Sequence, residues 1–197
     1  IRATDGAGSF SDQTFSLTVV NINDDPILDT VPANSATEDK LYSVKLNASD
    51  PDEGDQVNFL GQDLPSWLSL SSKGLLEGTP RNENVGNNTV KIILNDLYGG
   101  SSEFEWIISV ENINDPPHFL SNPGSNPSTL EDNVYSYEVI STDQDQNDST
   151  LLTIIEKPTW VSFDSDTGII SGTPTNDEVG SHQFKIRSTD KLGEYTD

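Results

Sequence analysis

The sequence predicts an all-β protein made of tandem β-sandwiches, and three observations support that fold class. Apolar residues alternate with polar residues in short runs, which is the period of a β-strand. Clusters of Gly, Pro, Asn and Asp separate these runs as turns. Nearly every landmark of the 197-residue chain recurs at one interval of roughly 91 to 94 residues, which indicates internal repeats.

The chain opens on a partial copy of the repeat. The stretch "ATDGAGSFSDQTFSLTVVNIND" at residues 3–24 aligns with "LNDLYGGSSEFEWIISVENIND" at residues 94–115. By this alignment Ile1 lies midway through a sixth strand, and residues 13–20 form a whole seventh strand whose five partner strands are missing. We assign residues 1–26 to the last strands and linker of a preceding, truncated repeat.

The first complete repeat covers residues 27–117. It contains "TEDKLYSVKLNASDPDEGD" at residues 37–55 and "LPSWLSLSSKGLLEGTPRNENVG" at residues 64–86. The alternating apolar residues of its strands are Tyr42, Val44, Leu46, Val90, Ile92, Leu94, Trp106, Ile108 and Val110. About seven strands in roughly 92 residues match the size and rhythm of an immunoglobulin-like Greek-key sandwich.

The second complete repeat covers residues 118–197 and carries the same landmarks. These are "LEDNVYSYEVISTDQDQND" at residues 130–148 and "KPTWVSFDSDTGIISGTPTNDEVG" at residues 157–180. By alignment, Asp197 stops just before the place of the seventh strand, so we expect this repeat to lack its last strand.

Composition limits the possible partners and cofactors. Ten Lys and Arg against 33 Asp and Glu give a formal net charge of −23, which repels nucleic acid and anionic membrane surfaces and attracts cations. The chain has no cysteine, which excludes disulfides, thiolate zinc sites and cysteine nucleophiles. It also has no methionine, signal peptide or apolar run near the ~18 residues of a spanning helix. We expect no membrane insertion, and interpret the chain as a piece of a longer protein.

Three acidic segments of each repeat are expected to meet at one end of its sandwich. In this topology the loops after the second strand and before the last strand return to the end where the linker enters. For the first repeat these segments are "NINDDP" at 21–26, "ASDPDEGD" at 48–55 and "NDLYGG" at 95–100. The first junction should therefore gather Asn23, Asp24, Asp25, Asp50, Asp52 and Asp96. The second junction should gather Asn114, Asp115, Asp143, Asp145 and Asp190.

A carboxylate from the preceding repeat is expected at the second junction. The "TED" motif at residues 37–39 lies at the far end of its own sandwich, so Glu38, and with it Asp39, can reach across. The "LED" motif at residues 130–132 would serve the next junction along. Carboxylates a few ångströms apart repel by several kcal/mol per pair at an effective dielectric of about 20. Ca²⁺ removes this repulsion and accepts six to eight oxygen ligands in irregular geometry, which favours it over Mg²⁺.

The acidic motifs resemble those of cadherins. The linker resembles the D-x-N-D-N-x-P segment between cadherin domains, "SDPD" and "TDQD" resemble the DxD motif, and "NDLYGG" resembles the D-x-G loop. The pattern P-x-W-L/V-x-L/F followed by G-x-L/I-x-G-T-P resembles the dystroglycan-type cadherin-like and immunoglobulin-like repeats of very large bacterial surface adhesins. The resemblance covers nearly the whole chain. It implies Ca²⁺ between successive domains of a stiff extracellular rod, or repeats that bind polysaccharide.

Two departures from cadherins bear on the number of ions. Asn21 and Asn112 stand where cadherins use Asp, and the L-D-x-E motif is missing. The resemblance therefore implies fewer or weaker calcium sites than in animal cadherins. Acidic turns also form without a metal, because Asp and Asn satisfy their own backbone. That alternative explains each loop separately, but it does not explain their convergence on two junctions.

Other functions find less support in the residues. Trp67 and Trp160 could stack on sugar rings, but their identical place in both repeats favours a structural role. His118 and His182 fall at unrelated repeat positions, and no Ser/His/Asp set or phosphate-binding glycine loop is present. Two carboxylates could hydrolyse a glycoside, but these cluster at domain ends, so we expect no enzyme.

The first and last segments of the chain are complementary. We expect Phe15, Leu17 and Val19, within residues 13–20, to insert into the open second repeat of a neighbouring molecule, as in donor-strand complementation. Head-to-tail filaments would follow, as an artefact of where the fragment is cut. For the parent protein we expect a calcium-stiffened, rigid extender of a cell-surface or extracellular adhesin. The alternative is a calcium-dependent polysaccharide-binding module, which needs an exposed aromatic strip.

Overall fold

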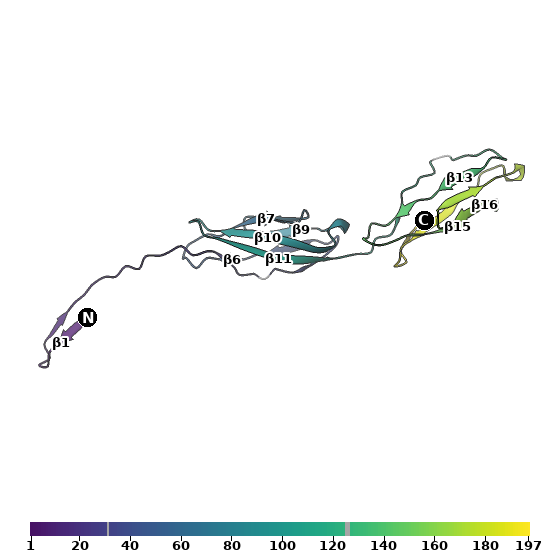
Figure 1. The fold of residues 1–197 in the computed structure, drawn as a ribbon. Coiled ribbons are helices and arrows are strands. Elements are labelled where there is room, and N and C mark those ends of the chain that lie inside the picture. The colour runs from purple at the N-terminus through teal and green to yellow at the C-terminus, as the bar shows by residue number, and fades with distance from the viewer. Residues whose placement is uncertain (31, 125–126) are drawn as a thin grey trace.

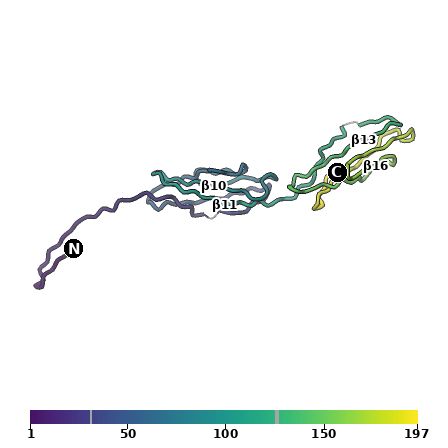
Figure 2. Tube along the Cα trace, in the orientation of Figure 1, coloured from purple at the N-terminus to yellow at the C-terminus, as the bar shows by residue number. Residues whose placement is uncertain are grey.

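The computed structural model describes residues 1–30, 32–124 and 127–197, and its strands form two β-sandwiches that follow one another along the chain (Figure 1). The tube view shows the two sandwiches arranged end to end, with the N-terminal segment extending away from the first (Figure 2). Helical structure among the described residues is limited to two 3-10 turns, Asn82–Asn84 and Asn176–Glu178. No helix in those ranges is long and apolar enough to cross a membrane. The predicted all-β fold class is confirmed.

The first sandwich contains two main sheets and a short pair of strands. One sheet has the order β4-β11-β10-β7, the other has the order β5-β9-β8, and β3 pairs with β6. The bounds are β3 (Ile27–Leu28), β4 (Ser35–Thr37), β5 (Tyr42–Lys45), β6 (Ala48–Ser49), β7 (Asn58–Asp63), β8 (Leu68–Leu70), β9 (Leu75–Gly78), β10 (Gly86–Asn95) and β11 (Ser101–Glu111).

The alternation of apolar residues places one face of each sheet in the core. Ile92 and Leu94 of β10 and Ile108 of β11 have no exposed surface. Trp67 packs edge-on against Tyr42, with ring centroids 5.9 Å apart, at the margin of this core. These contacts agree with a structural role for the tryptophan.

The second sandwich repeats this arrangement with a smaller core. Its sheets have the orders β13-β17-β16 and β15-β18-β19, and β12 pairs with β14. The bounds are β12 (His118–Phe119), β13 (Tyr135–Glu138), β14 (Ser141–Thr142), β15 (Leu151–Glu156), β16 (Val161–Asp164), β17 (Ile169–Gly172), β18 (Lys185–Thr189) and β19 (Tyr195–Thr196). The core is formed by Val139, Leu152, Val161 and Ile170.

The last strands of the second sandwich correct one expectation. β19 pairs with β18 and aligns with the first residues of β11, so the seventh strand begins before Asp197 and not after it. The part of β11 that aligns beyond β19, residues 104–111, pairs in the first sandwich with both β10 and β4. In the second sandwich, the counterparts of those partners at residues 128–130 and 180–184 form no strand.

The N-terminal segment corrects a second expectation. β1 (Arg2–Thr4) and β2 (Phe10–Asp12) form a hairpin, and the Arg2 guanidinium donates two hydrogen bonds of 2.8 Å to the Asp12 carboxylate. The predicted strand at residues 13–20 is wrong for the single chain, because those residues form no strand. A strand needs a neighbour for its backbone groups, and none of the described strands lies beside this segment.

Candidate metal centres at the domain junctions

The first junction is tied together by hydrogen bonds from the linker to both acidic loops. The Asn23 side-chain amide donates to Asp96 Oδ2 at 2.9 Å, and the Asp24 backbone N–H donates to Asp52 Oδ2 at 2.8 Å. The Asn21 side-chain amide donates to Asp52 Oδ1 at 2.8 Å. The three segments that the sequence placed at one end of the sandwich therefore do meet there.

Asp96 is held in its ionised form within this junction. The hydrogen bond from the Asn23 side chain lowers its pKa, and backbone N–H groups of the following turn add to this effect although burial opposes it. Those N–H groups belong to Tyr98, Gly99 and Gly100, and they donate to Asp96 Oδ1 at 2.7, 2.7 and 2.9 Å. A Cβ at Gly100 would lie 2.2 Å from Asp96 Oδ2 and 2.8 Å from the Asp24 carbonyl oxygen, so the side chain and linker pack closely against this glycine.

Three carboxylates, including that of Asp96, converge at the first junction, and one of their oxygens is unsatisfied. One oxygen each of Asp50, Asp55 and Asp96 lie within 4.8 Å of one another. Desolvation raises the pKa of Asp55, and the charges of Asp50 and Asp52 add to the shift. Asp50 Oδ2 is buried and has no hydrogen-bond partner among the described residues. An unpartnered buried carboxylate oxygen is costly unless it is paired with a cation.

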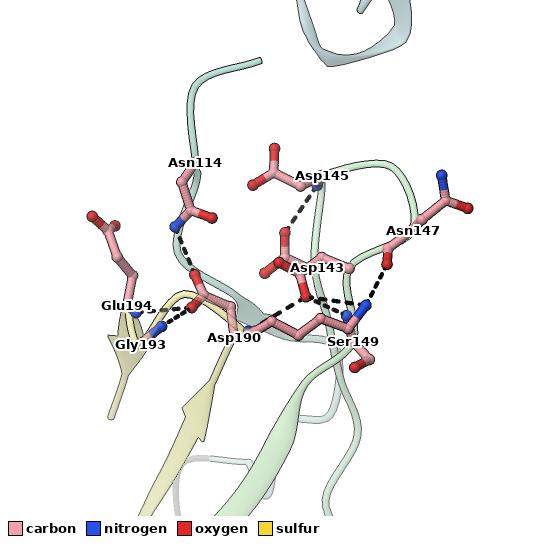
Figure 3. Close-up of polar contacts among 10 residues, drawn as sticks. Asn114, Asp143, Asp145, Asn147, Ser149, Asp190, Gly193 and Glu194 are labelled. Carbon is pink, nitrogen blue, oxygen red and sulfur yellow. Dashed lines mark hydrogen bonds and ion pairs between the residues drawn. The ribbon is translucent and has the colours of Figure 1, made fainter.

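The second junction repeats the main hydrogen bonds of the first at equivalent residues (Figure 3). The Asn114 side-chain amide donates to Asp190 Oδ2 at 2.7 Å. The Asp115 backbone N–H donates to Asp145 Oδ2 at 2.9 Å, and the Asp145 N–H donates to Asp143 Oδ1 at 2.9 Å. The same contacts at two places in one chain show that the repeated motif builds a repeated junction.

One acidic group of the second junction, Asp145, is more deeply buried than its counterpart Asp52 at the first. Asp145 and Asp190 are each 7% exposed. Burial opposes ionisation of Asp190, but hydrogen bonds from the Asn114 side chain and from backbone N–H groups lower its pKa overall. Three buried oxygens lack a hydrogen-bond partner within the described ranges: Asn114 Oδ1, Asp143 Oδ2 and Asp145 Oδ1. Oxygens of Asp143, Asp148 and Asp190 lie within 4.8 Å of one another.

Glu38 from the first sandwich also lies at the second junction. Its side chain is fully buried, and its Oε2 accepts a hydrogen bond of 3.0 Å from the backbone N–H of Ile113. Burial raises the pKa of Glu38, and the nearby charges of Asp115 and Asp145 add to the shift. Oε1 has no partner in the described part of the chain. The Asn82 side-chain amide, also from the first sandwich, donates to Asp115 Oδ2 at 2.8 Å.

Two of the predicted ligands interact with other groups. The prediction also omitted two residues that belong to the carboxylate clusters. Asp25 Oδ1 accepts a hydrogen bond of 2.9 Å from the backbone N–H of Ser101, and Asp39 forms an ion pair with Arg81. The missed residues are Asp55 and Asp148, which belong to the two carboxylate clusters. The signal that could have found them is their shared position, since each follows the first Asp of its loop by five residues.

The two junctions differ in how far their linker residues are buried and in the presence of one lysine. Asn23 and Asp24 are exposed, whereas their counterparts at the second junction are half-buried, because the first sandwich covers that side. Lys191 stands at the repeat position of Leu97, and its Nζ lies 3.8 Å from Asp148 Oδ1. The second cluster therefore has a protein cation beside it, and no ion pair of this kind is found at the first cluster among the described residues.

A family model described as "Putative Ig domain" matches residues 25–111 and again residues 116–197. Among curated proteins, the "Serine-rich adhesin for platelets" of Staphylococcus aureus strain N315 is 30% identical over 157 residues, and that of strain USA300 is 29% identical over the same length. Each alignment covers 79% of this chain and 7% of the adhesin. The chain thus corresponds to a small part of the length of these relatives.

Solved structures similar to this chain include two cadherin ectodomains. The protocadherin GammaB4 extracellular domain has a TM-score of 0.51 at 19% identity, over 95% of this chain and 35% of that one. Mouse cadherin-23 EC22-24 has a TM-score of 0.51 at 18% identity, over 88% of this chain and 64% of that one. At these identities the likeness shows a shared fold.

Proposed function

Because the chain belongs to the family described as "Putative Ig domain", we propose that it is a calcium-binding segment of a long extracellular or cell-surface adhesin. In this proposal Ca²⁺ at the junctions between successive domains stiffens a rod. The domains are residues 27–117 and 118–197, preceded by the end of another repeat at residues 1–26. The segment acts as an extender and has no catalytic role.

The observation that supports this proposal most strongly is the set of unsatisfied oxygens at the second junction. Four buried side-chain oxygens there lack a hydrogen-bond partner among the described residues: Glu38 Oε1, Asn114 Oδ1, Asp143 Oδ2 and Asp145 Oδ1. Buried polar atoms in native proteins are nearly always satisfied, so such a set points to a bound ion. All four are oxygens of carboxylates or a side-chain amide, which are the ligands that hard cations prefer.

The composition of the site favours Ca²⁺ over other cations. There is no cysteine in the chain, and the two histidines are outside both clusters, which argues against the softer transition metals. Mg²⁺ requires near-ideal octahedral geometry and retains several waters, whereas Ca²⁺ accepts a larger, irregular set of oxygens. Oxygens supplied by a linker and two loops, with a glutamate from the preceding sandwich, form an irregular set of this kind.

A cation at the second junction would couple the orientations of the two sandwiches. Glu38 belongs to the first sandwich, whereas Asp145 and Asp190 belong to the second. Without a cation these carboxylates repel one another across the linker. With one, they become ligands of a shared centre, and the angle between the sandwiches is fixed.

The adhesion context is inferred from the relatives. The staphylococcal proteins that match 79% of this chain carry the name adhesin, and the chain spans 6–11% of the relatives' lengths. A segment of that relative size, made of domains in series, suits a spacer within a long surface protein. The alternative of polysaccharide binding is less favoured, because Trp67, Trp106 and Trp160 are each half-buried.

A calorimetric calcium titration of the chelator-stripped chain tests the proposal. Extracellular calcium modules typically bind with a dissociation constant near 10⁻⁴–10⁻³ M, so saturation is expected by about 10 mM. Mg²⁺ should compete poorly. As a matched control, Asp63→Ala removes an exposed carboxylate of β7 outside both clusters and should leave the titration unchanged. Absence of binding up to about 10 mM Ca²⁺ would reject the calcium function.

A further inference from the structure

Two turns of the first sandwich reach the second junction. The turn after β4 supplies Glu38, whose Oε2 accepts a hydrogen bond from the backbone N–H of Ile113. The other turn is η1 (Asn82–Asn84), which follows β9 and begins with Asn82. The Asn82 side chain is half-buried, and its amide donates to Asp115 Oδ2 at 2.8 Å. A neutral side chain of the first sandwich therefore contacts a carboxylate of the linker directly.

The two turns are joined to each other, which fixes Asn82 relative to Glu38. The backbone N–H of Asp39 donates to the Pro80 carbonyl at 2.9 Å. Asp39 has a φ of 56°, a left-handed conformation that Asp tolerates better than most residues. Its carboxylate forms an ion pair with Arg81, the residue just before η1. Asp39, which sequence analysis assigned to the metal, thus connects the two turns that face the junction.

Asp115 is the linker residue at which contacts from both sandwiches meet. Its backbone N–H donates to Asp145 Oδ2 of the second sandwich at 2.9 Å, and its own Oδ2 accepts the Asn82 bond from the first. The described residues offer no hydrogen bond to Asp115 Oδ1. Burial raises the pKa of Glu38, and the charges of Asp115 and Asp145 raise it further, so the three carboxylates lie close together.

Two buried oxygens beside Asp115 point to a bound cation. Glu38 has no exposed surface and Asp145 is 7% exposed. Glu38 Oε1 and Asp145 Oδ1 both lack a hydrogen-bond partner within the described ranges. Buried carboxylate oxygens of this kind are costly unless a cation pairs with them. Asp115 Oδ1 is a third oxygen available at the same place.

We propose that Asn82 is a positioning residue for the metal centre of the second junction. Its amide holds Asp115 Oδ2, which leaves Asp115 Oδ1 to bind Ca²⁺ together with the two unsatisfied oxygens. A carboxylate that is fixed before the ion arrives loses less conformational freedom on binding. This inference rests on the proposed calcium function and deepens it, because it names a residue that controls affinity without touching the ion.

The residue type suits this role. An amide N–H donates to a carboxylate without a positive charge, whereas lysine or arginine would compete with the ion. A carboxylate at the same place would repel Asp115 whenever the ion is absent. The second sandwich has an asparagine at the same repeat position, Asn176, which begins η2 (Asn176–Glu178). Its side chain is exposed, so Asn176→Ala is a matched control.

Calcium titration of Asn82→Ala by calorimetry is the first test. Affinity at the second junction should fall about tenfold, the lower end of the loss usual for residues that orient metal ligands. Affinity at the first junction should not change, and Asn176→Ala should bind as the wild type does. Unchanged affinity in Asn82→Ala would overturn the proposal. An equal loss in Asn176→Ala would show a general effect and would also overturn it.

A double-variant comparison tests whether Asn82 acts through Asp115. Asp115→Ala should lower calcium affinity at the second junction by itself, because an anionic ligand is lost. Adding Asn82→Ala to Asp115→Ala should cost nothing further, since two residues that act as one unit are not additive. A further tenfold loss in the double variant would show that Asn82 binds the ion itself or acts elsewhere, and the proposal would fail.

Europium luminescence separates positioning from a merely structural effect. Eu³⁺ is a hard cation that prefers oxygen ligands, and its decay rates in H₂O and D₂O report the number of waters bound to it. One equivalent is added to an Asp50→Ala chain, in which the first cluster is impaired. With Asn82→Ala the ion should carry about one more water, because water replaces a lost oxygen ligand. Weaker binding with no additional water would mean a structural effect and would overturn the proposal.

The two claims fail in distinguishable ways. Absence of both calcium and europium binding by the parent chain would end the proposed function and this inference together. Normal binding by the parent that Asn82→Ala leaves unchanged, in affinity and in bound water, would end the inference alone. The proposed function would then stand without a role for Asn82.

Discussion

The fully buried Glu38 carboxylate of the first sandwich accepts a hydrogen bond of 3.0 Å from the backbone N–H of Ile113, beyond the last strand of that sandwich. This contact holds one carboxylate oxygen against the linker and leaves the other unsatisfied within the described ranges. Glu38 thus brings a carboxylate from the first sandwich to the second junction. It is therefore the most sensitive position for testing whether calcium binds between the two sandwiches.

Glu38→Gln should have opposite effects on calcium binding and on calcium-free stability. The amide keeps an oxygen that can accept the Ile113 hydrogen bond but removes the charge. Calcium affinity at the second junction should fall about tenfold, because one anionic ligand is lost. In chelator, the free energy of unfolding should rise, because the substitution removes a buried charge that has no cationic partner there. Calorimetry and urea unfolding measure the two effects, and a loss of stability in chelator would contradict them.

The stability of the calcium-free protein should increase on mild acidification. Burial raises the pKa of Glu38 above its usual value of 4.5. The folded state therefore binds more protons than the unfolded state between the two pKa values, and stability falls as pH rises through that window. Urea unfolding in chelator should show this slope in the wild type and a smaller one in Glu38→Gln. With saturating Ca²⁺ the slope should reverse, because the ion requires ionised carboxylates.

The two junctions should lose calcium independently. Asp50 and Asp143 occupy equivalent positions in the two clusters. Asp50→Ala should remove binding at the first junction and leave the second intact, and Asp143→Ala should do the reverse. Because the clusters share no residue, the two losses should add in the double variant. Equal loss at both junctions in either single variant would reject the assignment of one centre to each junction.

Lys191→Leu should strengthen calcium binding at the second junction. Lys191 Nζ lies 3.8 Å from Asp148 Oδ1, so its charge competes with a metal ion for that carboxylate. The substitution introduces the residue found at the same repeat position in the first sandwich, Leu97. Affinity should rise about threefold, in line with the modest energies of exposed ion pairs. Lys73→Leu, an exposed lysine in a turn, controls for the change in net charge, and an equal gain there would exclude a local effect.

The fold class and the meeting of the acidic loops could be predicted from the sequence because both follow from repetition. Strand periodicity within each repeat fixed which residues face the core, as the full burial of Ile92 and Ile108 shows. The topology shared by the two sandwiches then predicted that the linker and both acidic loops meet at one end of each domain. The reach of Glu38 to the second junction followed from the same topology.

Other details depend on conformation or on partners that local patterns do not specify. Asp55 and Asp148 looked like ordinary turn residues, and their approach to the other carboxylates depends on the loop conformation. Asp39 turns to Arg81, which lies 42 residues further along the chain. Residues 13–20 have the apolar alternation of a strand but form no strand in the single chain. Such a pattern shows that a segment can form a strand, but it does not show that a neighbouring strand is present to pair with it.

The central claim, that calcium fixes the orientation of the two sandwiches, is tested most directly by a distance distribution between them. Spin labels at Thr89→Cys on β10 and Ser162→Cys on β16 report it, since both positions are exposed and no native cysteine interferes. The account predicts a broad distribution in chelator that narrows to a single peak with Ca²⁺, and no narrowing in Asp143→Ala. A distribution of the same width with and without Ca²⁺ would contradict it.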